Sequence, residues 1–157
     1  MAAGISLPGY VMGNGIRQLL TTFWIGGMWV VGVLVAPALF GSLDNALAGR
    51  LAGKILGLMG WVGIVAGSYL LIWWLWVEGL RALRNGRFWL VLLMLVCTLI
   101  NQFAVFPIIA GLKPAMVNAS EGLFGGGFAT WHAISTLIYF VQALLGVAYV
   151  WGEGGSR

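Results

Sequence analysis

Four long apolar stretches alternate with short polar connections along this chain. They cover residues 19–40, 55–77, 89–110 and 128–151, and none of them contains Asp, Glu, Lys or Arg. A helix rises about 1.5 Å per residue, so a stretch the length of 19–40 spans about 33 Å, enough for the hydrocarbon core of a bilayer. The pattern predicts an all-α, integral membrane four-helix bundle that forms a single transmembrane domain over residues 1–157.

The amino-acid composition agrees with a lipid environment. Hydrophobic residues make up 61% of the 157 residues and charged residues 8%, against about 25% charged residues in a soluble domain. A chain of this size cannot bury so much apolar surface within itself, so lipid must be part of its solvent. The net charge of +4 forms no basic amphipathic face, and we therefore expect the lipid bilayer, and no nucleic acid, as a partner.

The placement of basic residues predicts the orientation. Four spans put the N-terminus, the connection 78–88 and the C-terminus on one side of the membrane. That side carries Arg17, Arg81, Arg84, Arg87 and Arg157, whereas the other carries Arg50, Lys54 and Lys113. Because basic residues concentrate on the cytoplasmic side, we expect a multi-pass protein of the inner (plasma) membrane with both termini in the cytoplasm.

A shift of 70 positions aligns the chain with itself. The matched pairs are Arg17 with Arg87, Val35 with Val105, Pro37 with Pro107, Gly41 with Gly111, Gly57 with Gly127, Trp61 with Trp131, Ile64 with Ile134 and Tyr69 with Tyr139. Such an alignment predicts two repeated two-helix hairpins in parallel orientation, related by a pseudo-twofold axis along the membrane normal. The alternative is that two apolar hairpins match by chance.

The second stretch carries glycines at steps of three or four residues. They are Gly53, Gly57, Gly60, Gly63 and Gly67. A ridge without side chains lets another backbone approach closely, so we assign these glycines to helix packing, with a homo-oligomer interface as the alternative. The residues just before this stretch, 42–54, are expected to form a separate short interfacial helix that Asp44 or Asn45 caps.

Polar side chains at membrane depth occur on the third and fourth helices. The third carries Asn101 and Gln102, and the fourth carries His132, Ser135 and Tyr139 close to one helical face. Polar groups within a span usually point into the bundle. The sequence therefore predicts a polar ligand site between helices three and four.

Two prolines and the histidine share one depth. Pro37 and Pro107 are structural residues in the last turns before the non-cytoplasmic surface, and each frees a backbone carbonyl one turn earlier. His132 begins the fourth helix at about this depth. Three roles are open for it: a structural hydrogen bond to such a carbonyl, contact with a ligand or ion, or ligation of a metal or haem.

Metal and catalytic chemistry find little support in the sequence. His132, Cys97, Met28 and Met94 would suit Cu(I), but no paired ligand spacing occurs, and a single histidine excludes bis-histidine haem. We therefore expect no cofactor, with copper or haem as alternatives. No carboxylate lies within a span and no hydrolase motif is present, so no catalytic residue is assigned and a non-enzymatic protein is favoured.

Short motifs in a fixed order resemble a known family. They are Trp24-Ile25-Gly26-Gly27, Ala36-Pro37-Ala38-Leu39-Phe40, Ala48-Gly49-Arg50, Gly53-Lys54-Ile55, Asn101 with Pro107, and Phe128 with Trp131-His132 and Ser135. From Trp24 to Gly146 the chain resembles the uncharacterised bacterial four-helix membrane family related to transmembrane protein 205. Its first-helix pattern is also distantly similar to copper-resistance protein D and HemJ-type proteins. The resemblance implies a small inner-membrane protein, with metal or drug tolerance suggested by the eukaryotic relative.

Three functions follow from these observations. The leading hypothesis is a non-enzymatic protein for transport or for metal or drug tolerance, which acts through the polar site between helices three and four. The second is an accessory or structural subunit of a larger membrane complex, which the glycine ridge and the tryptophans near the membrane surface would suit. The third is a haem- or copper-binding membrane redox protein, a hypothesis that His132 alone motivates.

Overall fold

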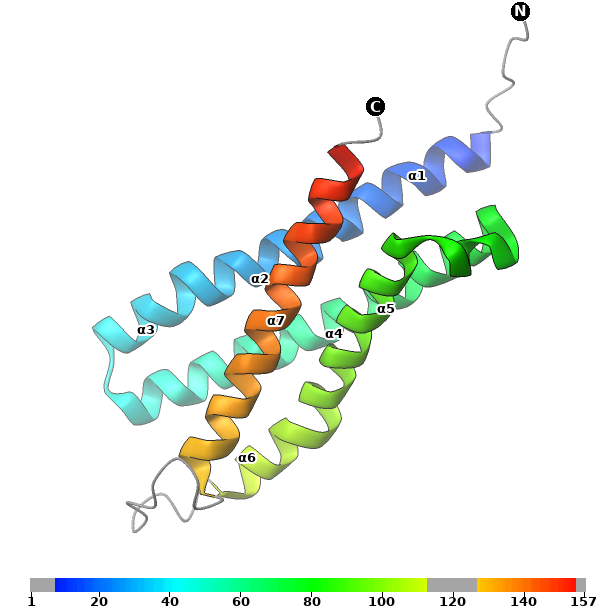
Figure 1. Cartoon of the computed structure of the whole chain (residues 1–157). Coiled ribbons are helices and arrows are strands. Elements are labelled where there is room, and N and C mark those ends of the chain that lie inside the picture. The colour runs from blue at the N-terminus through cyan, green and yellow to red at the C-terminus, as the bar shows by residue number, and fades with distance from the viewer. Residues whose placement is uncertain (1–7, 113–126, 155–157) are drawn as a thin grey trace, which may run out of the picture.

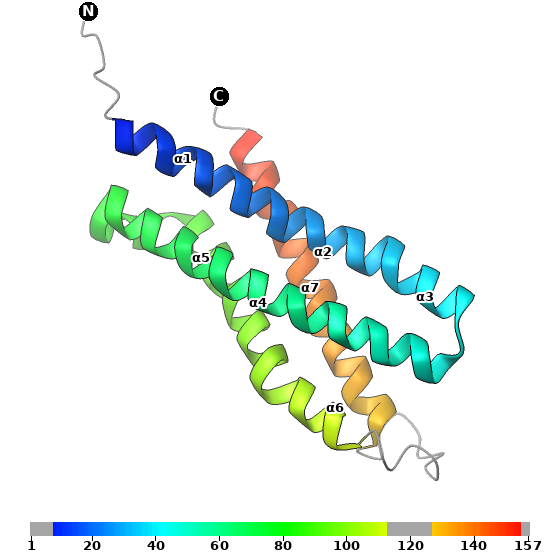
Figure 2. The same ribbon diagram turned by 180° about the vertical axis from the view of Figure 1, so that it is seen from behind.

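The computed structural model describes residues 8–112 and 127–154, and all its regular elements are helices. Four of these helices are long and apolar enough to cross a membrane: Met12–Ser42, Leu47–Arg84, Gly86–Leu112 and Thr130–Gly152. The predicted all-α four-helix bundle is therefore confirmed. The start of the first helix and the end of the last lie at the same end of the bundle in both views (Figure 1, Figure 2).

The first and third helices change their winding along their length. The first runs through α1 (Pro8–Thr21), the π-helical η1 (Thr22–Gly26), α2 (Gly27–Trp29), the π-helical η2 (Val30–Val35) and α3 (Ala36–Ser42). The third runs through α5 (Gly86–Leu99), the π-helical η4 (Ile100–Val105) and α6 (Phe106–Leu112). The other two are regular: α4 (Asn45–Glu78), which continues into the 3₁₀ helix η3 (Gly79–Arg84), and α7 (Phe128–Gly154).

The wide turns at η2 and η4 precede the two prolines and lie 70 positions apart, whereas η1 precedes no proline and has no π-helical counterpart in α5. Ala36 N–H donates to the carbonyl of Val31, and Phe106 N–H donates to the carbonyl of Asn101, five residues back in both cases. Proline lacks an amide hydrogen and its ring presses on the carbonyl four residues earlier. A π turn widens the helix at this point and relieves that contact. The matched backbone supports the predicted pair of parallel two-helix hairpins.

The expectation of a separate interfacial helix at 42–54 is wrong. A single helix begins at Asn45 and continues without interruption to Glu78. Asp44 caps it, since its Oδ1 accepts a hydrogen bond from the backbone N–H of Leu47 at 3.1 Å. Hydropathy marks where the hydrocarbon begins, but the alanines and leucines of this segment favour helix on either side of that boundary.

Three of the five glycines on α4 make room for large side chains inside the bundle. A Cβ on Gly63 would lie 2.6 Å from Nε1 of Trp24, and one on Gly67 would lie 3.0 Å from its Cη2. A Cβ on Gly60 would lie 2.2 Å from Oε1 of Gln102. The other two differ: nothing lies within 4 Å of such an atom on Gly57, and Gly53 is partly buried.

A compact apolar core holds the four helices together. Its fully buried large side chains are Trp24, Met28, Leu70, Val91, Met94 and Tyr149, which come from all four long helices. Only 1% of the Trp24 surface is exposed, because the missing side chains on α4 let the indole fill the space between helices one and two.

Candidate functional site

Polar side chains gather where the first, third and fourth helices meet. The third helix contributes Thr98, Asn101 and Gln102, and α7 contributes Ser135, Tyr139 and Gln142. Thr98, Asn101, Ser135 and Gln142 are all buried. Burying a polar group in an apolar interior costs free energy unless the group is hydrogen-bonded. The hydrogen bonds among these side chains therefore determine which polar atoms remain available to a ligand.

Asn101 and Ser135 form one half of the cluster. Ser135 Oγ donates to Asn101 Oδ1 at 2.8 Å, and Asn101 Nδ2 donates to the Ser135 carbonyl at 3.4 Å. These two hydrogen bonds therefore pair the polar groups of Asn101 and Ser135 across the contact between η4 and α7. The carbonyl of Asn101 also closes the π turn before Pro107, which links the bend in helix three to its contact with helix four.

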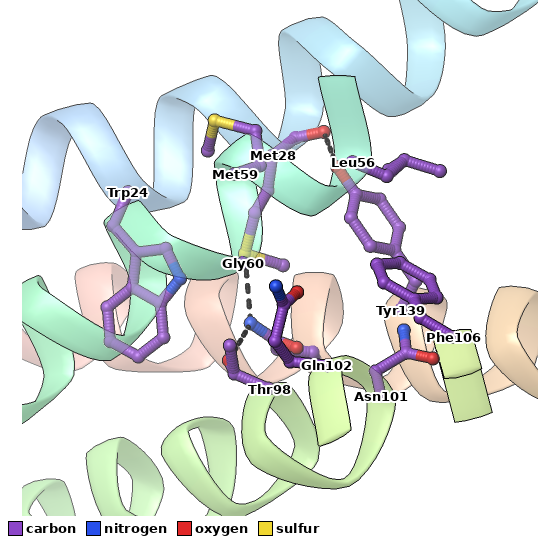
Figure 3. Close-up of a pocket in the computed structure, with 11 residues that line it drawn as sticks. Trp24, Met28, Leu56, Met59, Gly60, Thr98, Asn101, Gln102, Phe106 and Tyr139 are labelled. Carbon is purple, nitrogen blue, oxygen red and sulfur yellow. Dashed lines mark hydrogen bonds between the residues drawn. The ribbon is translucent and has the colours of Figure 1, made fainter. Parts of the chain in front are cut away.

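Gln142 and Tyr139 form the other half and reach the first helix. Gln142 Nε2 donates to Thr98 Oγ1 at 2.9 Å and to Met28 Sδ at 3.4 Å. Thr98 Oγ1 donates in turn to the Met94 carbonyl at 2.9 Å. Tyr139 OH donates to the Met28 carbonyl at 2.6 Å. Met28 therefore accepts from both residues of helix four, and Figure 3 shows its contact with Tyr139.

A small cavity of about 20 Å³ adjoins these polar groups, and apolar side chains make up the rest of its wall. Its lining is drawn in Figure 3 and consists of Trp24, Met28, Leu56, Met59, Gly60, Thr98, Asn101, Gln102, Phe106, Tyr139 and Gln142. Gln102 Oε1 is buried and accepts no hydrogen bond from any residue that the structure describes. The missing side chain of Gly60 makes the space that this oxygen occupies. The cavity therefore combines a volume for about one water molecule with an unused acceptor.

The structure does not bring His132 into this cluster. Its side chain is exposed, and its carbonyl accepts a hydrogen bond from Thr136 Oγ1 at 2.9 Å. Ser135, Tyr139 and Gln142 follow the spacing i, i+4 and i+7 and share one helical face. His132 lies three residues before Ser135, which at about 100° per residue places it within about 60° of that face, so its exposure follows from its position in the first turns of α7 and not from its direction. Of the predicted site residues, Asn101, Gln102, Ser135 and Tyr139 meet, and His132 lies outside.

The candidate soft metal ligands are dispersed. Met28 lines the cavity, Met94 is buried in the apolar core, and Cys97 is partly buried on α5. Within residues 8–112 and 127–154, no three His, Cys, Asp or Glu side chains lie close enough together to hold a metal ion. Copper or haem binding therefore stays a prediction without a ligand set.

The residues assigned to the ligand site from the sequence leave out part of the observed site. Thr98 and Gln142 are polar residues of the third and fourth helices that were not assigned to it, although the seven-residue spacing of Gln142 from Ser135 places it on the polar face of helix four. Trp24 and Gly60 line the cavity from helices one and two. Nothing local to either residue indicates a cavity, because the space arises only where a glycine on one helix faces a long side chain on another.

Comparison with known proteins identifies a family for most of the chain. A family model described as "Domain of unknown function (DUF4149)" matches residues 19–118. No curated protein and no solved structure matches significantly. The matched region covers the first long helix from Leu19 onward and all of the second and third, and therefore Thr98, Asn101 and Gln102, whereas Ser135, Tyr139 and Gln142 lie beyond it on α7.

Proposed function

The chain therefore belongs to this family of unknown function, and we propose that it is a small, non-enzymatic transport protein of the inner (plasma) membrane. Its solute site is the cavity between the third and fourth helices, closed by Trp24 and Met28 of the first helix. The arginine distribution supports cytoplasmic termini. The similarity to relatives of transmembrane protein 205 supports a small membrane protein that acts in transport or tolerance.

One observation carries this proposal: Gln102 Oε1 is buried beside the cavity without a hydrogen-bond partner among the described residues. A polar cluster that only held helices together would be most stable with every amide paired. Here Asn101 and Ser135 satisfy each other, and the neighbouring Gln102 is left with an open acceptor. Such an acceptor next to a cavity can bind a solute that donates a hydrogen bond.

The size and charge of the cavity define the class of solute. A volume of about 20 Å³ is that of one water molecule, whereas drug-sized ligands occupy about 300–1,000 Å³. All the residues that line the cavity are uncharged, so a bare ion would not recover its hydration energy there. The geometry favours a neutral hydrogen-bond donor close to the size of water over a drug or a metal ion.

The π turns supply a means of movement. Those at η2 and η4 each precede a proline and lie 70 positions apart, as the proposed repeat of two hairpins requires. Wide turns of this kind have weaker hydrogen-bond constraints and often mark functional sites in helices. Parallel repeats that rock around a shared site are one established architecture for membrane transport. A change at η4 would move Asn101 and Gln102 together, and with them the polar wall of the cavity.

Flux measurements on proteoliposomes test the proposal. Stopped-flow light scattering would compare water, ammonia and urea fluxes through vesicles with and without the wild-type protein. We expect Gln102→Leu to lower any protein-dependent flux at least tenfold, because it removes the open acceptor at nearly constant volume. Gln18→Leu is the matched control, since Gln18 is exposed on α1. Wild-type flux equal to that of empty vesicles for all three solutes, or full activity of Gln102→Leu, would refute the assignment.

A further inference from the structure

The six residues of the 3₁₀ helix η3 lie along three edges of the helix, two residues on each edge. A 3₁₀ helix has three residues per turn, so side chains at i and i+3 lie one above the other. Gly79 and Ala82 share one edge, Leu80 and Leu83 the second, and Arg81 and Arg84 the third. Ala82 is completely buried, while the leucines and the arginines are exposed. One edge therefore faces the protein, and the remaining two are an apolar edge and a cationic edge.

Several hydrogen bonds hold η3 in this geometry. The Asn85 amide donates to the Ala82 carbonyl at 2.9 Å, and Asn85 Oδ1 accepts from the Arg87 amide at 3.1 Å. Trp89 Nε1 donates to the Leu83 carbonyl at 2.8 Å. Gly79, at φ +57°, provides the left-handed turn that lets the chain leave α4. The two outer edges are therefore presented by a fixed platform.

The apolar edge locates η3 at the membrane surface. Leu80 is 81% exposed and Leu83 43% exposed, and full exposure of such a side chain to water costs about 1.5–3 kcal/mol relative to burial. Trp76 on α4 and Trp89 on α5 flank η3 and are also exposed. Tryptophans of this kind concentrate at the headgroup level of bilayers. The leucines consequently lie at the outer boundary of the acyl chains.

The cationic edge then lies among lipid headgroups. The Cα atoms of Arg81 and Arg84 are about 6 Å apart along the helix, given a rise of about 2 Å per residue. Neither arginine forms a hydrogen bond or ion pair in the part of the chain that the structure describes, and the same holds for Glu78, the acidic residue nearest to them. Two like charges this close repel each other, and a shared phosphate would relieve the repulsion through bidentate hydrogen bonds.

We propose that η3 is a binding site for one anionic phospholipid, such as phosphatidylglycerol or cardiolipin. Arg81 and Arg84 hold the headgroup phosphate, and Leu80 and Leu83 contact the beginning of the acyl chains. The adjacent apolar edge distinguishes a lipid from free phosphate, which would gain nothing from the leucines. The site lies at the far end of helix three from the cavity and does not depend on the transport proposal.

Native mass spectrometry of the detergent-solubilised protein tests this proposal. Phosphatidylglycerol or phosphatidylcholine would be added at equal concentration and the bound fraction compared. We expect wild type to prefer phosphatidylglycerol at least tenfold, and Arg81→Gln with Arg84→Gln to abolish the preference. The control is Arg50→Gln with Lys54→Gln, two exposed basic residues on the first turns of α4, which we expect to behave like wild type.

Two further measurements separate a lipid site from a phosphate site. Leu80→Ser with Leu83→Ser keeps both arginines, and we expect it to weaken phosphatidylglycerol binding several-fold. Inorganic phosphate at millimolar concentration should not displace the lipid from wild type. Equal binding of both lipids by wild type, an unchanged preference in the double arginine variant, or displacement by phosphate would each overturn the proposal. Circular dichroism of every variant checks that the helices remain intact.

Discussion

Gly63→Ala tests whether the α4 glycines are needed for packing inside the bundle. The new Cβ would lie 2.6 Å from Trp24 Nε1 and 3.2 Å from Thr98 Cγ2. Trp24 is 1% exposed and Thr98 is buried, so both side chains would have to shift within a packed interior whose adjoining cavity holds only about 20 Å³. Overpacking of this type lowers the free energy of unfolding by about 1–3 kcal/mol.

Gly57→Ala is the matched control on the same helix. No atom beyond the local helix lies within 4 Å of a Cβ at Gly57. Both variants gain about 0.5–1 kcal/mol from the better helix propensity of alanine, and this gain cancels when they are compared. We therefore expect Gly63→Ala to be less stable than Gly57→Ala by about 1–3 kcal/mol.

The assay is reversible unfolding of both variants in one detergent, with the free energy of unfolding obtained from circular dichroism across a series of denaturant concentrations. Gly57→Ala should be at least as stable as wild type. Equal free energies of unfolding for the two variants would refute the reasoning, because the Trp24 indole would then have to be free to move despite its burial.

The remaining predictions concern single hydrogen bonds and use the same unfolding assay. Tyr139→Phe removes the bond to the Met28 carbonyl and should lower the free energy of unfolding by about 0.5–1.5 kcal/mol; an unchanged value would show that this bond adds no net stability. Asp44→Ala removes the α4 cap and should cost about 1 kcal/mol, with faster amide hydrogen exchange in the first turn of α4. Ser135→Ala should cost about 1–2 kcal/mol because it leaves Asn101 Oδ1 buried without its donor. Combining it with Asn101→Val should restore stability to within about 0.5 kcal/mol of wild type, since both polar partners are then gone.

The number and order of the helices could be predicted because lipid constrains each residue of a span separately. Every residue that faces acyl chains must be apolar, so a stretch such as 89–110 identifies its own helix. The ends of the helices could not be predicted equally well. The second span was expected at 55–77, yet α4 begins ten residues earlier, at Asn45, and ends at Glu78, because backbone hydrogen bonding continues past the hydrocarbon boundary until a residue such as Gly79 breaks it.

The polar site was predictable only in part. Asn101 and Ser135 could be placed in the interior because neither is tolerated facing lipid. His132 was expected beside them, but helix ends lie near the headgroups, where an exposed polar side chain costs little. The cavity could not be foreseen, since it depends on Gly60 of helix two facing Gln102 of helix three. Whether these two residues face each other depends on how helices two and three cross. The crossing geometry cannot be predicted from the residues around either position.

The two halves of the chain share a π turn before a proline but not the polarity of that turn, and this contrast bears on why the cluster exists. Val31 and Gly32 occupy the positions in η2 that Asn101 and Gln102 occupy in η4, 70 residues later. The first half forms the same π turn with a buried valine, so the bend does not require a polar side chain. Burying Asn101 and Gln102 therefore adds desolvation that the backbone geometry does not need. The hydrogen bonds between Asn101 and Ser135 join helices three and four, and the Asn101→Val with Ser135→Ala variant separates this packing role from the proposed role in solute binding: it should retain the fold while altering the polar wall of the cavity.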